Sequence, residues 1–523
     1  MMAAVVLSAC GGDNDPRTSV VTLSGTVTFD LVPHLADSGG LDYPLTVEAP
    51  ARGVQVLLLD RGGDLLDSGT TTAEGTYTLQ APAGTDVRVR VEARMQRDGS
   101  PNWNFSVTDN TQGNALYVLD GQFVNSGSAH SVRDLHAASG WTGNGYAELR
   151  PAAPFAILDV IYDAVEQVRE VDPEVQLPPL EIRWSAANTA SSGDLTQGAI
   201  GTTFYSIDDQ SIYLLGWAGN DTDEYDRSVI AHEFAHYLEY QLGRTDSIGG
   251  DHSMTVKLDM RVAFSEGWSN AFAAITTAEP VYRDSIGVDQ SSGLYYSLET
   301  NFYGNAGWFS ENSVQKILYD LYDPANEDFD RISLGFAPVY QTLTSDDWRQ
   351  FDGATSIYPF IQQLKARTDV DGLLVDTLLE TENIFGTDAY GVNETNDGGL
   401  VAVLPVYRRL APGGSVALCS SQTEGDYNRL DVRRFVLLEL LDSGSYDISA
   451  EYVEGLAPSN PDFVLWQDGE PLLTAESETD REQVSVSLAP GTYWLEVYEQ
   501  ANVDQSSSTG GAVCFNLSLG YSP

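Results

Sequence analysis

The stretch from Ser228 to Glu239 constrains this chain more than any other. It contains the pattern His-Glu-x-x-His, with histidines at 232 and 236 and a glutamate at 233. Residues four apart lie on one face of a helix, so His232 and His236 can direct two imidazole rings at one metal ion. Glu233 stands beside them and can reach a water bound to that metal. The pattern therefore predicts a zinc-hydrolase site in which Glu233 is the catalytic base.

The residues around this pattern also predict a helix. Asp226 or Ser228 can cap its N-terminus, and Gly243 can end it. Apolar side chains for packing are supplied by Val229, Ile230, Phe234, Tyr237 and Leu238.

A third metal ligand has to come from elsewhere, because catalytic zinc usually takes three protein ligands and leaves one position for water. A second apolar helix is predicted at residues 261–275, with Glu266 as the one carboxylate in its middle. A lone buried charge is costly unless it is paired or bound to metal. Glu266 is therefore the preferred third ligand. The alternatives that remain open are Glu239, Asp251, His252 and Asp259.

The order His232-Glu233-x-x-His236, then Glu266 on a second helix, resembles the gluzincin class, the thermolysin-like zinc metallopeptidases. The resemblance implies an α+β zincin-like domain, one zinc ion held by His232, His236 and Glu266, and peptide-bond hydrolysis with Glu233 as base. This class often has an aspartate four residues after the ligand glutamate, which orients a ligand histidine. Here that position is Asn270, so its role stays open.

The same resemblance implies a donor that stabilises the transition-state oxyanion, commonly a Tyr or His. His252 lies between the two predicted helices, and Tyr295, Tyr296 and Tyr303 follow them. We predict Tyr303, because the glycines around it would let its hydroxyl approach the metal, although the sequence does not decide among the four. Calcium is possible beside zinc, but no calcium-loop motif supports it.

The flanking regions read as all-β. Residues 20–145 alternate in the manner of strands, for example over 20–28, 54–60 and 87–91. The run V-x-V-x-L-x-D followed by G-x-Y-x-L-x-x-P-A-G resembles the carboxypeptidase regulatory-like (transthyretin-like) sandwich. Residues 405–523 contain N-P-D-F-V-L-W and then L-x-P-G-T-Y-W-L-E-V-Y, which resembles the bacterial pre-peptidase C-terminal domain.

The N-terminus and the cysteines predict export. Residues 1–19 read as a lipoprotein signal remnant and tether, because Leu7-Ser-Ala-Cys10-Gly resembles a bacterial lipobox whose cysteine is lipidated. Cys419 and Cys514 then remain as an even pair, for which an exported chain favours a disulfide. We expect a membrane-anchored lipoprotein at the outer membrane or cell surface, or a secreted protein.

Charge excludes other functions. The formal net charge of −49 over 523 residues argues against nucleic-acid binding and against adhesion to anionic lipid headgroups. Lysine occurs only at 257, 316 and 365. An acidic, lysine-poor surface suits a salty medium, where salt screens self-repulsion.

These observations predict a multidomain chain in which an α+β zincin-like catalytic domain, residues 150–395, is flanked by two all-β sandwiches. The predicted function is a zinc-dependent endopeptidase acting on protein or peptide substrates. The alternatives are a non-catalytic surface binding protein on a zincin scaffold, or a zinc hydrolase of another amide bond such as that of peptidoglycan. The natural substrate, the cleavage preference and the oligomeric state stay open.

Overall fold

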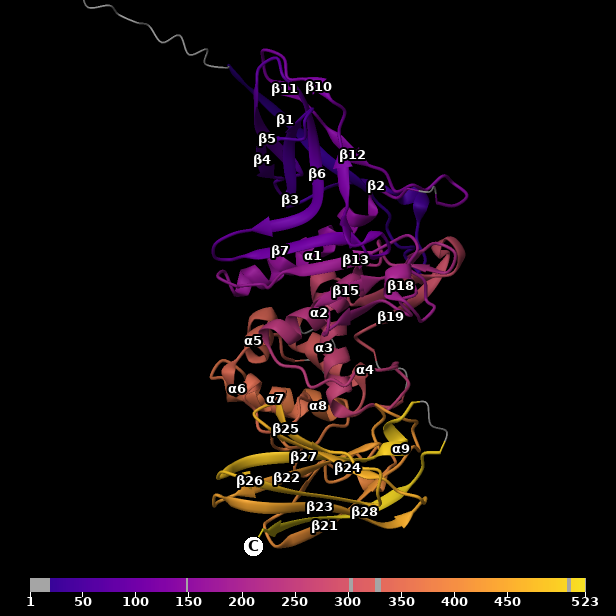
Figure 1. The fold of residues 1–523 in the computed structure, drawn as a ribbon, viewed down its shortest axis with the longest axis vertical. Helices are drawn as coiled ribbons and strands as arrows, with labels where there is room; N and C mark the ends of the chain where they lie inside the picture. The colour runs from indigo at the N-terminus through magenta and orange to yellow at the C-terminus, as the bar shows by residue number, and fades with distance from the viewer. Residues whose placement is uncertain (1–18, 147–148, 301–303, 325–330, 506–508, 523) are drawn as a thin grey trace, which may run out of the picture.

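The computed structural model describes residues 19–146, 149–300, 304–324, 331–505 and 509–522. A β-rich N-terminal part, a mixed central part and a C-terminal sandwich follow one another along the long axis of the molecule (Figure 1). Cys10 and Tyr303, for which the sequence predicted a lipid anchor and a catalytic donor, lie outside the described residues.

The N-terminal part is built around β1 (Val20–Leu31), whose side chains are alternately buried and half-buried. One sheet joins β1 to four shorter strands: β2 (Val47–Pro50), β5 (Thr76–Pro82), β11 (Ser131–Val132) and β12 (Leu135–Ala137). The strands β3 (Val54–Asp60), β4 (Leu65–Thr70) and β6 (Asp86–Arg97) belong to a second sheet. The strands predicted over 20–28, 54–60 and 87–91 are all present.

This second sheet does not stop at the expected domain boundary. It has ten strands, and its main path runs in the order β14-β15-β13-β7-β6-β3-β4. The path includes β7 (Trp103–Asp109), β13 (Leu180–Trp184), β14 (Phe204–Ser206) and β15 (Ser211–Leu214). Three short strands pair beside it: β8 (Ala115–Leu116), β9 (Val118–Asp120) and β10 (Val124–Asn125).

Strands from residues 20–145 and from residues 150–395 thus share one sheet. The reason lies in β6, which stays alternately buried over nearly its whole length. Residues 87–95 of β6 pair with β3, and residues 94–97 pair with β7, as in the register of Arg94 with Ser106. One long strand therefore joins the N-terminal strands to the strands β7, β13, β15 and β14.

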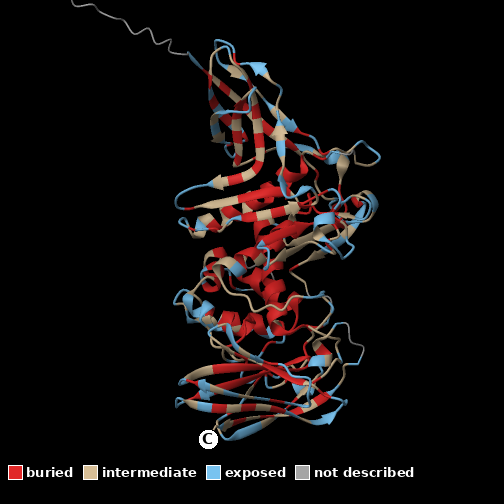
Figure 2. Cartoon of the chain, viewed as in Figure 1, coloured by how far each residue is buried: buried red, intermediate tan, exposed pale blue. Residues whose placement is uncertain are grey.

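The helices lie against this sheet. The two helices predicted around the His-Glu-x-x-His pattern and at residues 261–275 are α2 (Arg227–Leu242) and α3 (Met260–Thr277). Four further helices are α1 (Ala153–Val171), α4 (Glu311–Tyr322), α7 (Ile357–Ala366) and α8 (Gly372–Thr381). Two short helices, α5 (Phe336–Leu343) and α6 (Asp346–Arg349), complete the group. Every residue of α3 except the last is buried, and Figure 2 shows the same concentration of buried positions in α2 and α3.

A small four-stranded sheet lies beside the helices, on a segment for which the sequence predicted no strands. Its order is β16 (Gly216–Trp217), β17 (Asp221–Thr222), β18 (Val281–Ile286) and β19 (Ser292–Ser297). The burial of β18 does not alternate clearly, so its pattern gave little strand signal.

The C-terminal part is a sandwich of two sheets. The five-stranded sheet contains β20 (Tyr407–Arg409), β22 (Arg433–Leu440), β27 (Gly491–Glu499), β24 (Pro461–Gln467) and β25 (Glu470–Ala475). The four-stranded sheet contains β21 (Gly414–Ser420), β28 (Val513–Tyr521), β23 (Gly444–Gly455) and β26 (Arg481–Leu488). A short helix, α9 (Gln500–Val503), follows β27. The predicted disulfide between Cys419 and Cys514 is present and joins β21 to β28.

A buried ion-pair group fixes α3 to this sandwich. Arg261, at the start of α3, is 1% exposed and donates two hydrogen bonds of 2.9 Å to the Glu496 carboxylate on β27. It also donates to Asp259, and Arg433 lies against the same Glu496 carboxylate. Among the described residues, no helix is both long and apolar enough to cross a membrane.

Candidate metal centre

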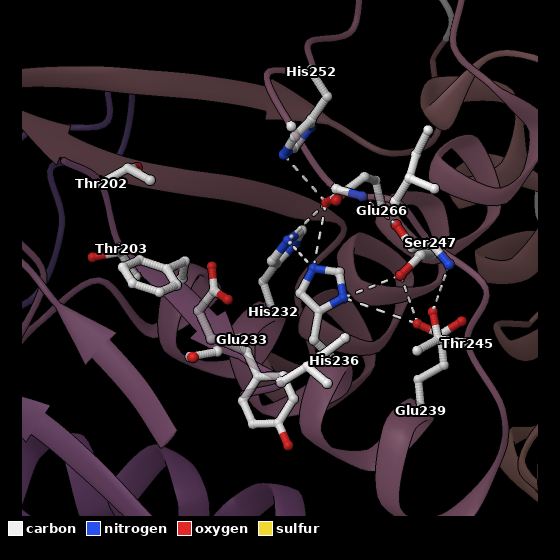
Figure 3. Close-up of a pocket in the computed structure, with 18 of the residues that line it drawn as sticks. Thr202, Thr203, His232, Glu233, His236, Glu239, Thr245, Ser247, His252 and Glu266 are labelled. Carbon is white, nitrogen blue, oxygen red and sulfur yellow. Dashed lines mark hydrogen bonds and ion pairs between the residues drawn. The ribbon is translucent and has the colours of Figure 1, made fainter. Parts of the chain in front are cut away.

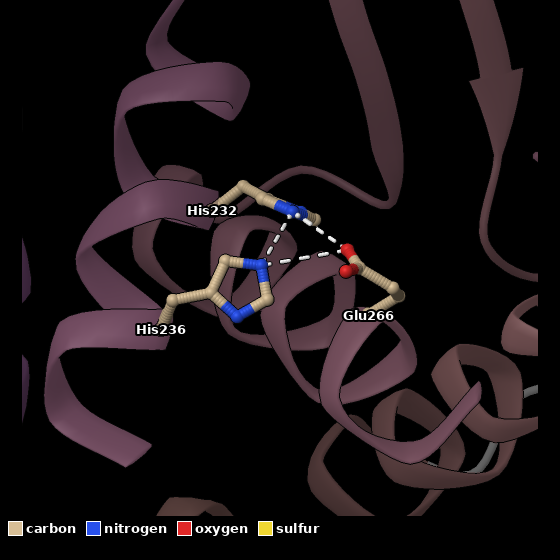
Figure 4. A group of neighbouring side chains, drawn as sticks. All are labelled: His232, His236 and Glu266. Carbon is tan, nitrogen blue, oxygen red and sulfur yellow. Dashed lines mark hydrogen bonds and ion pairs between the residues drawn. The ribbon is translucent and has the colours of Figure 1, made fainter. Parts of the chain in front are cut away.

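Two crossing helices bring the predicted ligands together. His232 and His236 project from α2, and Glu266 projects from the middle of α3 toward them (Figure 4). The two histidine Nε2 atoms lie 3.1 Å apart. Glu266 Oε2 lies 3.2 Å from Nε2 of His232 and 3.4 Å from Nε2 of His236. The side chains of His232 and Glu266 are buried, and that of His236 is mostly buried.

These separations fit a zinc ion. Ligand atoms about 2.0–2.1 Å from zinc at tetrahedral angles are about 3.3 Å from one another. Glu266 Oε2 is buried and makes no hydrogen bond, although imidazole nitrogens surround it. A cation among the three atoms would satisfy this orphaned oxygen. Two imidazoles and one carboxylate are also the donor set that catalytic zinc takes.

Neighbouring side chains orient both histidines. Asn270 Oδ1 lies 2.8 Å from His232 Nδ1. An amide oxygen only accepts, so His232 carries its proton on Nδ1 and turns the lone pair of Nε2 toward the metal position. His236 Nδ1 lies 3.2 Å from the Ser265 hydroxyl and 3.1 Å from that of Ser269. Asn270 therefore fixes the orientation of the His232 ring through this hydrogen bond.

Three of the alternative ligands, Glu239, Asp259 and His252, make contacts with other residues. Glu239 Oε2 is 4.0 Å from His236 Nδ1, the nitrogen that faces away from the metal position. Asp259 caps α3 and pairs with Arg261. His252 comes closest, since its Nε2 lies 3.3 Å from Glu266 Oε2. The carboxylate of Glu311, at the start of α4, holds its other ring nitrogen, Nδ1, at 2.7 Å.

The electrostatics of the centre suit a cation. Burial raises the pKa of Glu266, but His252 and His236 outweigh this and hold the pKa well below its ordinary value. Burial lowers the pKa of His236, yet Glu266 and Glu239 keep it well above the ordinary range. Burial likewise lowers the pKa of His252, while Glu266 and Glu311 raise it to about 9. The carboxylates of this site thus attract protons to the imidazoles, and a metal ion would replace them.

A cavity of about 670 Å³ opens beside the three residues. Glu233 lines it and is 7% exposed, next to His232 (Figure 3). The opposite wall is residues 202–208, which include β14. Because β14 stands at the end of the sheet order, its outer edge faces this cavity. β14 is thus an edge strand whose residues line the cavity.

A second cavity of about 400 Å³ lies beyond Glu233 and shares His232 and His252 with the first. Its wall contains Tyr282 and Tyr296, whose rings stack at 5.2 Å. It also contains Asp221, Asp223 and Asp284, whose carboxylates group with that of Asp226 ahead of α2. Burial raises the pKa of Asp221, Asp223 and Asp284, and the neighbouring carboxylates raise it further.

The predicted oxyanion donors have different positions. His252 lines both cavities, as described above. Tyr296 lines the second cavity, and Tyr295 is 47% exposed beside it on β19. The roles of Glu311 and Tyr282 were missed from the sequence. The local sequence does not identify either residue. Glu311 is an acidic residue in the first turn of a helix, which is a common position, and Tyr282 belongs to the strand β18, which was not predicted.

One comparison with known protein families matches the central part of the chain. The family model described as the Mycolysin C-terminal domain matches residues 172–357, which include α2 and α3. This similarity indicates a protein of a peptidase family and leaves the catalytic residues and the metal unassigned. A search of curated proteins finds no match.

Two of the solved structures that match this chain align with part of it at low sequence identity. The precursor of protealysin, a metalloproteinase from Serratia proteamaculans, is 10% identical over 54% of this chain and 87% of its own, with a TM-score of 0.30. The pre-peptidase C-terminal domain of a collagenase from Bacillus anthracis is 17% identical over 22% of this chain and 93% of its own, with a TM-score of 0.17. These TM-scores are too low to assign either fold to this chain.

Proposed function

We propose that this protein is a zinc-dependent endopeptidase of gluzincin type. One observation carries the proposal: the Nε2 atoms of His232 and His236 and the Oε2 atom of Glu266 converge within 3.1–3.4 Å, with Glu233 on the same cavity. A pure binding scaffold has no need of a carboxylate base there. The match of residues 172–357 to the Mycolysin C-terminal domain supports the same class.

Each residue then has a defined task. A bound zinc ion would lower the pKa of its water toward neutrality and polarise the scissile carbonyl. Glu233 takes the proton from the attacking water and later passes it to the leaving amine. The free edge of β14 accepts an extended peptide as an additional strand, which aligns the scissile bond with the centre.

For the oxyanion donor we propose His252 in preference to Tyr303, because His252 is held in place. Its Nδ1 contacts Glu311, so Nε2 faces the metal position and can donate to a developing negative charge. Burial lowers the pKa of His252, but the carboxylates of Glu266 and Glu311 raise it to about 9, so in the metal-free state the ring is protonated at neutral pH and able to donate. We also propose that the protein is exported, which the disulfide supports.

The test measures bound zinc and casein hydrolysis for the wild type and for Glu233→Gln. We expect about one zinc per chain in both proteins, with hydrolysis lost only in the variant, because the substitution removes the base and leaves the ligands intact. A wild type that holds zinc and cleaves no protein substrate would contradict the proposal. That result would favour a non-catalytic binding scaffold. If the same wild-type protein released peptides from peptidoglycan, the result would favour a hydrolase of that amide bond.

A further inference from the structure

Glu239 is a buried carboxylate that the proposed reaction does not use. It lies on α2, three residues after His236, and is 1% exposed. Its Oε2 accepts a hydrogen bond of 2.6 Å from the Ser265 hydroxyl. Its Oε1 is buried and has no hydrogen-bond partner among the described residues. A buried carboxylate oxygen without a partner is costly, so its retention needs a reason.

This carboxylate belongs to the wall of the same cavity as the metal ligands. The cavity wall next to it is formed by Thr245, Ser247 and Ser265 (Figure 3). His236 does not complete its coordination, because His236 Nδ1 lies 4.0 Å from Oε2, beyond hydrogen-bonding distance. The position therefore offers an acceptor and surrounding hydroxyls to a group that enters from the cavity.

The rest of the cleft is rich in carboxylates. Among the described residues that line either cavity, none is a lysine or an arginine, and the basic side chains are the histidines of the centre. The second cavity adds the carboxylates of Asp221, Asp223 and Asp284 on the other side of Glu233. Carboxylates between low-dielectric walls focus the field and concentrate ligands of positive charge.

We propose that Glu239 makes this enzyme selective for peptides with a lysine or arginine side chain next to the scissile bond. The inference rests on the proposed peptidase function and names its substrate class. An ammonium or guanidinium group would donate to Glu239 Oε1 and complete the hydrogen bonding of that oxygen. Such charge-assisted hydrogen bonds are the strong ones, and a partner removed from one of them leaves a buried charge unpaired.

The test uses zinc-loaded, full-length protein and a set of peptides that differ only at one residue. Lysine, arginine, norleucine or glutamate is placed at each of the two positions that flank the cleaved bond, and kcat/KM is measured for each. Norleucine keeps the aliphatic stem of lysine and lacks the charge. We expect the wild type to prefer lysine or arginine over norleucine by about tenfold or more at one of the two positions.

The variant Glu239→Gln should lower the ratio of kcat/KM for lysine over norleucine by about tenfold to a hundredfold. The matched control is Glu380→Gln, which removes a charge from an exposed residue of α8 outside both cavities and should keep the ratio. If both peptides lose kcat/KM equally in Glu239→Gln, Glu239 only supports His236, and the inference is wrong.

The wild-type measurement decides the matter even if the variant does not fold. Cleavage of all peptides without preference for a basic residue would overturn the inference and leave the peptidase function intact. Absence of cleavage of every peptide by zinc-loaded wild type would instead refute the proposed function, on which the inference depends.

Discussion

The metal centre is the part of this molecule that single residues determine. The spacing of His232 and His236 on one helix was predictable, because helical geometry fixes it. Glu266 was predictable as the one carboxylate in an apolar helix, and it lies within 3.4 Å of both histidines. Glu311 was not predictable, since its contact with His252 joins residues far apart in sequence. Local pattern thus identified the three residues that converge at the candidate metal site, and not Glu311, which contacts His252 beside them.

The first prediction concerns Asn270, which accepts from His232 Nδ1 at 2.8 Å. We expect Asn270→Ala to weaken zinc binding by about 10- to 100-fold, because the ring loses the partner that fixes its tautomer and orientation. Titration with a competing chelator measures the affinity. Asn270→Asp is the matched variant and should keep tight binding, since a carboxylate accepts the same hydrogen bond. Equal affinities for wild type and Asn270→Ala would show that Asn270 has no orienting role.

The second prediction concerns His252. If its Nε2 donates to the oxyanion, His252→Gln should lower kcat by about 10²- to 10³-fold with a smaller change in KM. Glu311→Gln should give an intermediate loss, because His252 stays present but loses its 2.7 Å partner. Steady-state kinetics on one peptide check both variants, and His130→Gln, at an exposed histidine, is the control. An unchanged kcat in His252→Gln would mean that His252 is not the oxyanion donor and would favour one of the tyrosines.

At the scale of elements, periodicity predicted the long helices and most strands of the C-terminal sandwich, since each buries one face. It could not show that β6 serves two regions. The alternating pattern of a strand does not depend on how many neighbouring strands pair with it. Only the pairing of β6 with both β3 and β7 shows that it belongs to both regions. The strand β18 was missed for the opposite reason, because its half-buried residues lack alternation.

The third prediction concerns the anchoring of α3. Arg261 is 1% exposed and shares the Glu496 carboxylate with Arg433. Arg261→Ala should lower the free energy of unfolding by about 3–5 kcal/mol, because it leaves Asp259 and Glu496 buried with less compensation. Arg409→Ala is the control, since its ion pair with Glu439 is exposed and should contribute less than about 1 kcal/mol. Urea unfolding compares them, and equal losses would contradict the expectation.

The fourth prediction concerns β24. Burial, together with the negative charges of Glu482, Glu476 and Glu499, raises the pKa of Asp462 to about 8. The folded state then binds a proton that the unfolded state has released, so this group stabilises folding less as pH rises from about 4 to about 8. Asp462→Asn should remove that part of the pH dependence and be more stable than wild type at pH 8 by at least about 1 kcal/mol.

Urea unfolding at pH 5, 6.5 and 8 tests the effect of Asp462. The control is Asp480→Asn, which removes an exposed carboxylate from the same sandwich and should follow the wild-type pH dependence. Parallel pH profiles for wild type and Asp462→Asn would mean that Asp462 is not the group responsible.

At the scale of the whole molecule, the regions are less separate than their sequence signatures indicate. One continuous core contains Val21 of the N-terminal part, Trp268 of α3 and Trp494 of the C-terminal sandwich. The sandwich has a second core of its own, which includes Phe463 and Phe515. Family-like patterns locate modules along a chain, but they do not report which buried faces two modules share. The sequence therefore suggests boundaries near residues 145 and 405, but the hydrophobic core continues across both of them.

The last prediction follows from the charge of the whole chain. A formal net charge of −49 produces self-repulsion that the compact state suffers more than the extended one. Raising NaCl shortens the Debye length from about 10 Å at 0.1 M to about 3 Å at 1 M, which screens this repulsion. We expect the Tm to rise by a few degrees over that range, since one kcal/mol shifts the Tm of a large domain by about 2–4 °C. Differential scanning calorimetry in NaCl and, separately, in KCl separates general screening from binding of one cation. A Tm that falls with both salts would show that favourable ion pairs, such as those of Arg261 and Arg150, outweigh the repulsion in this fold.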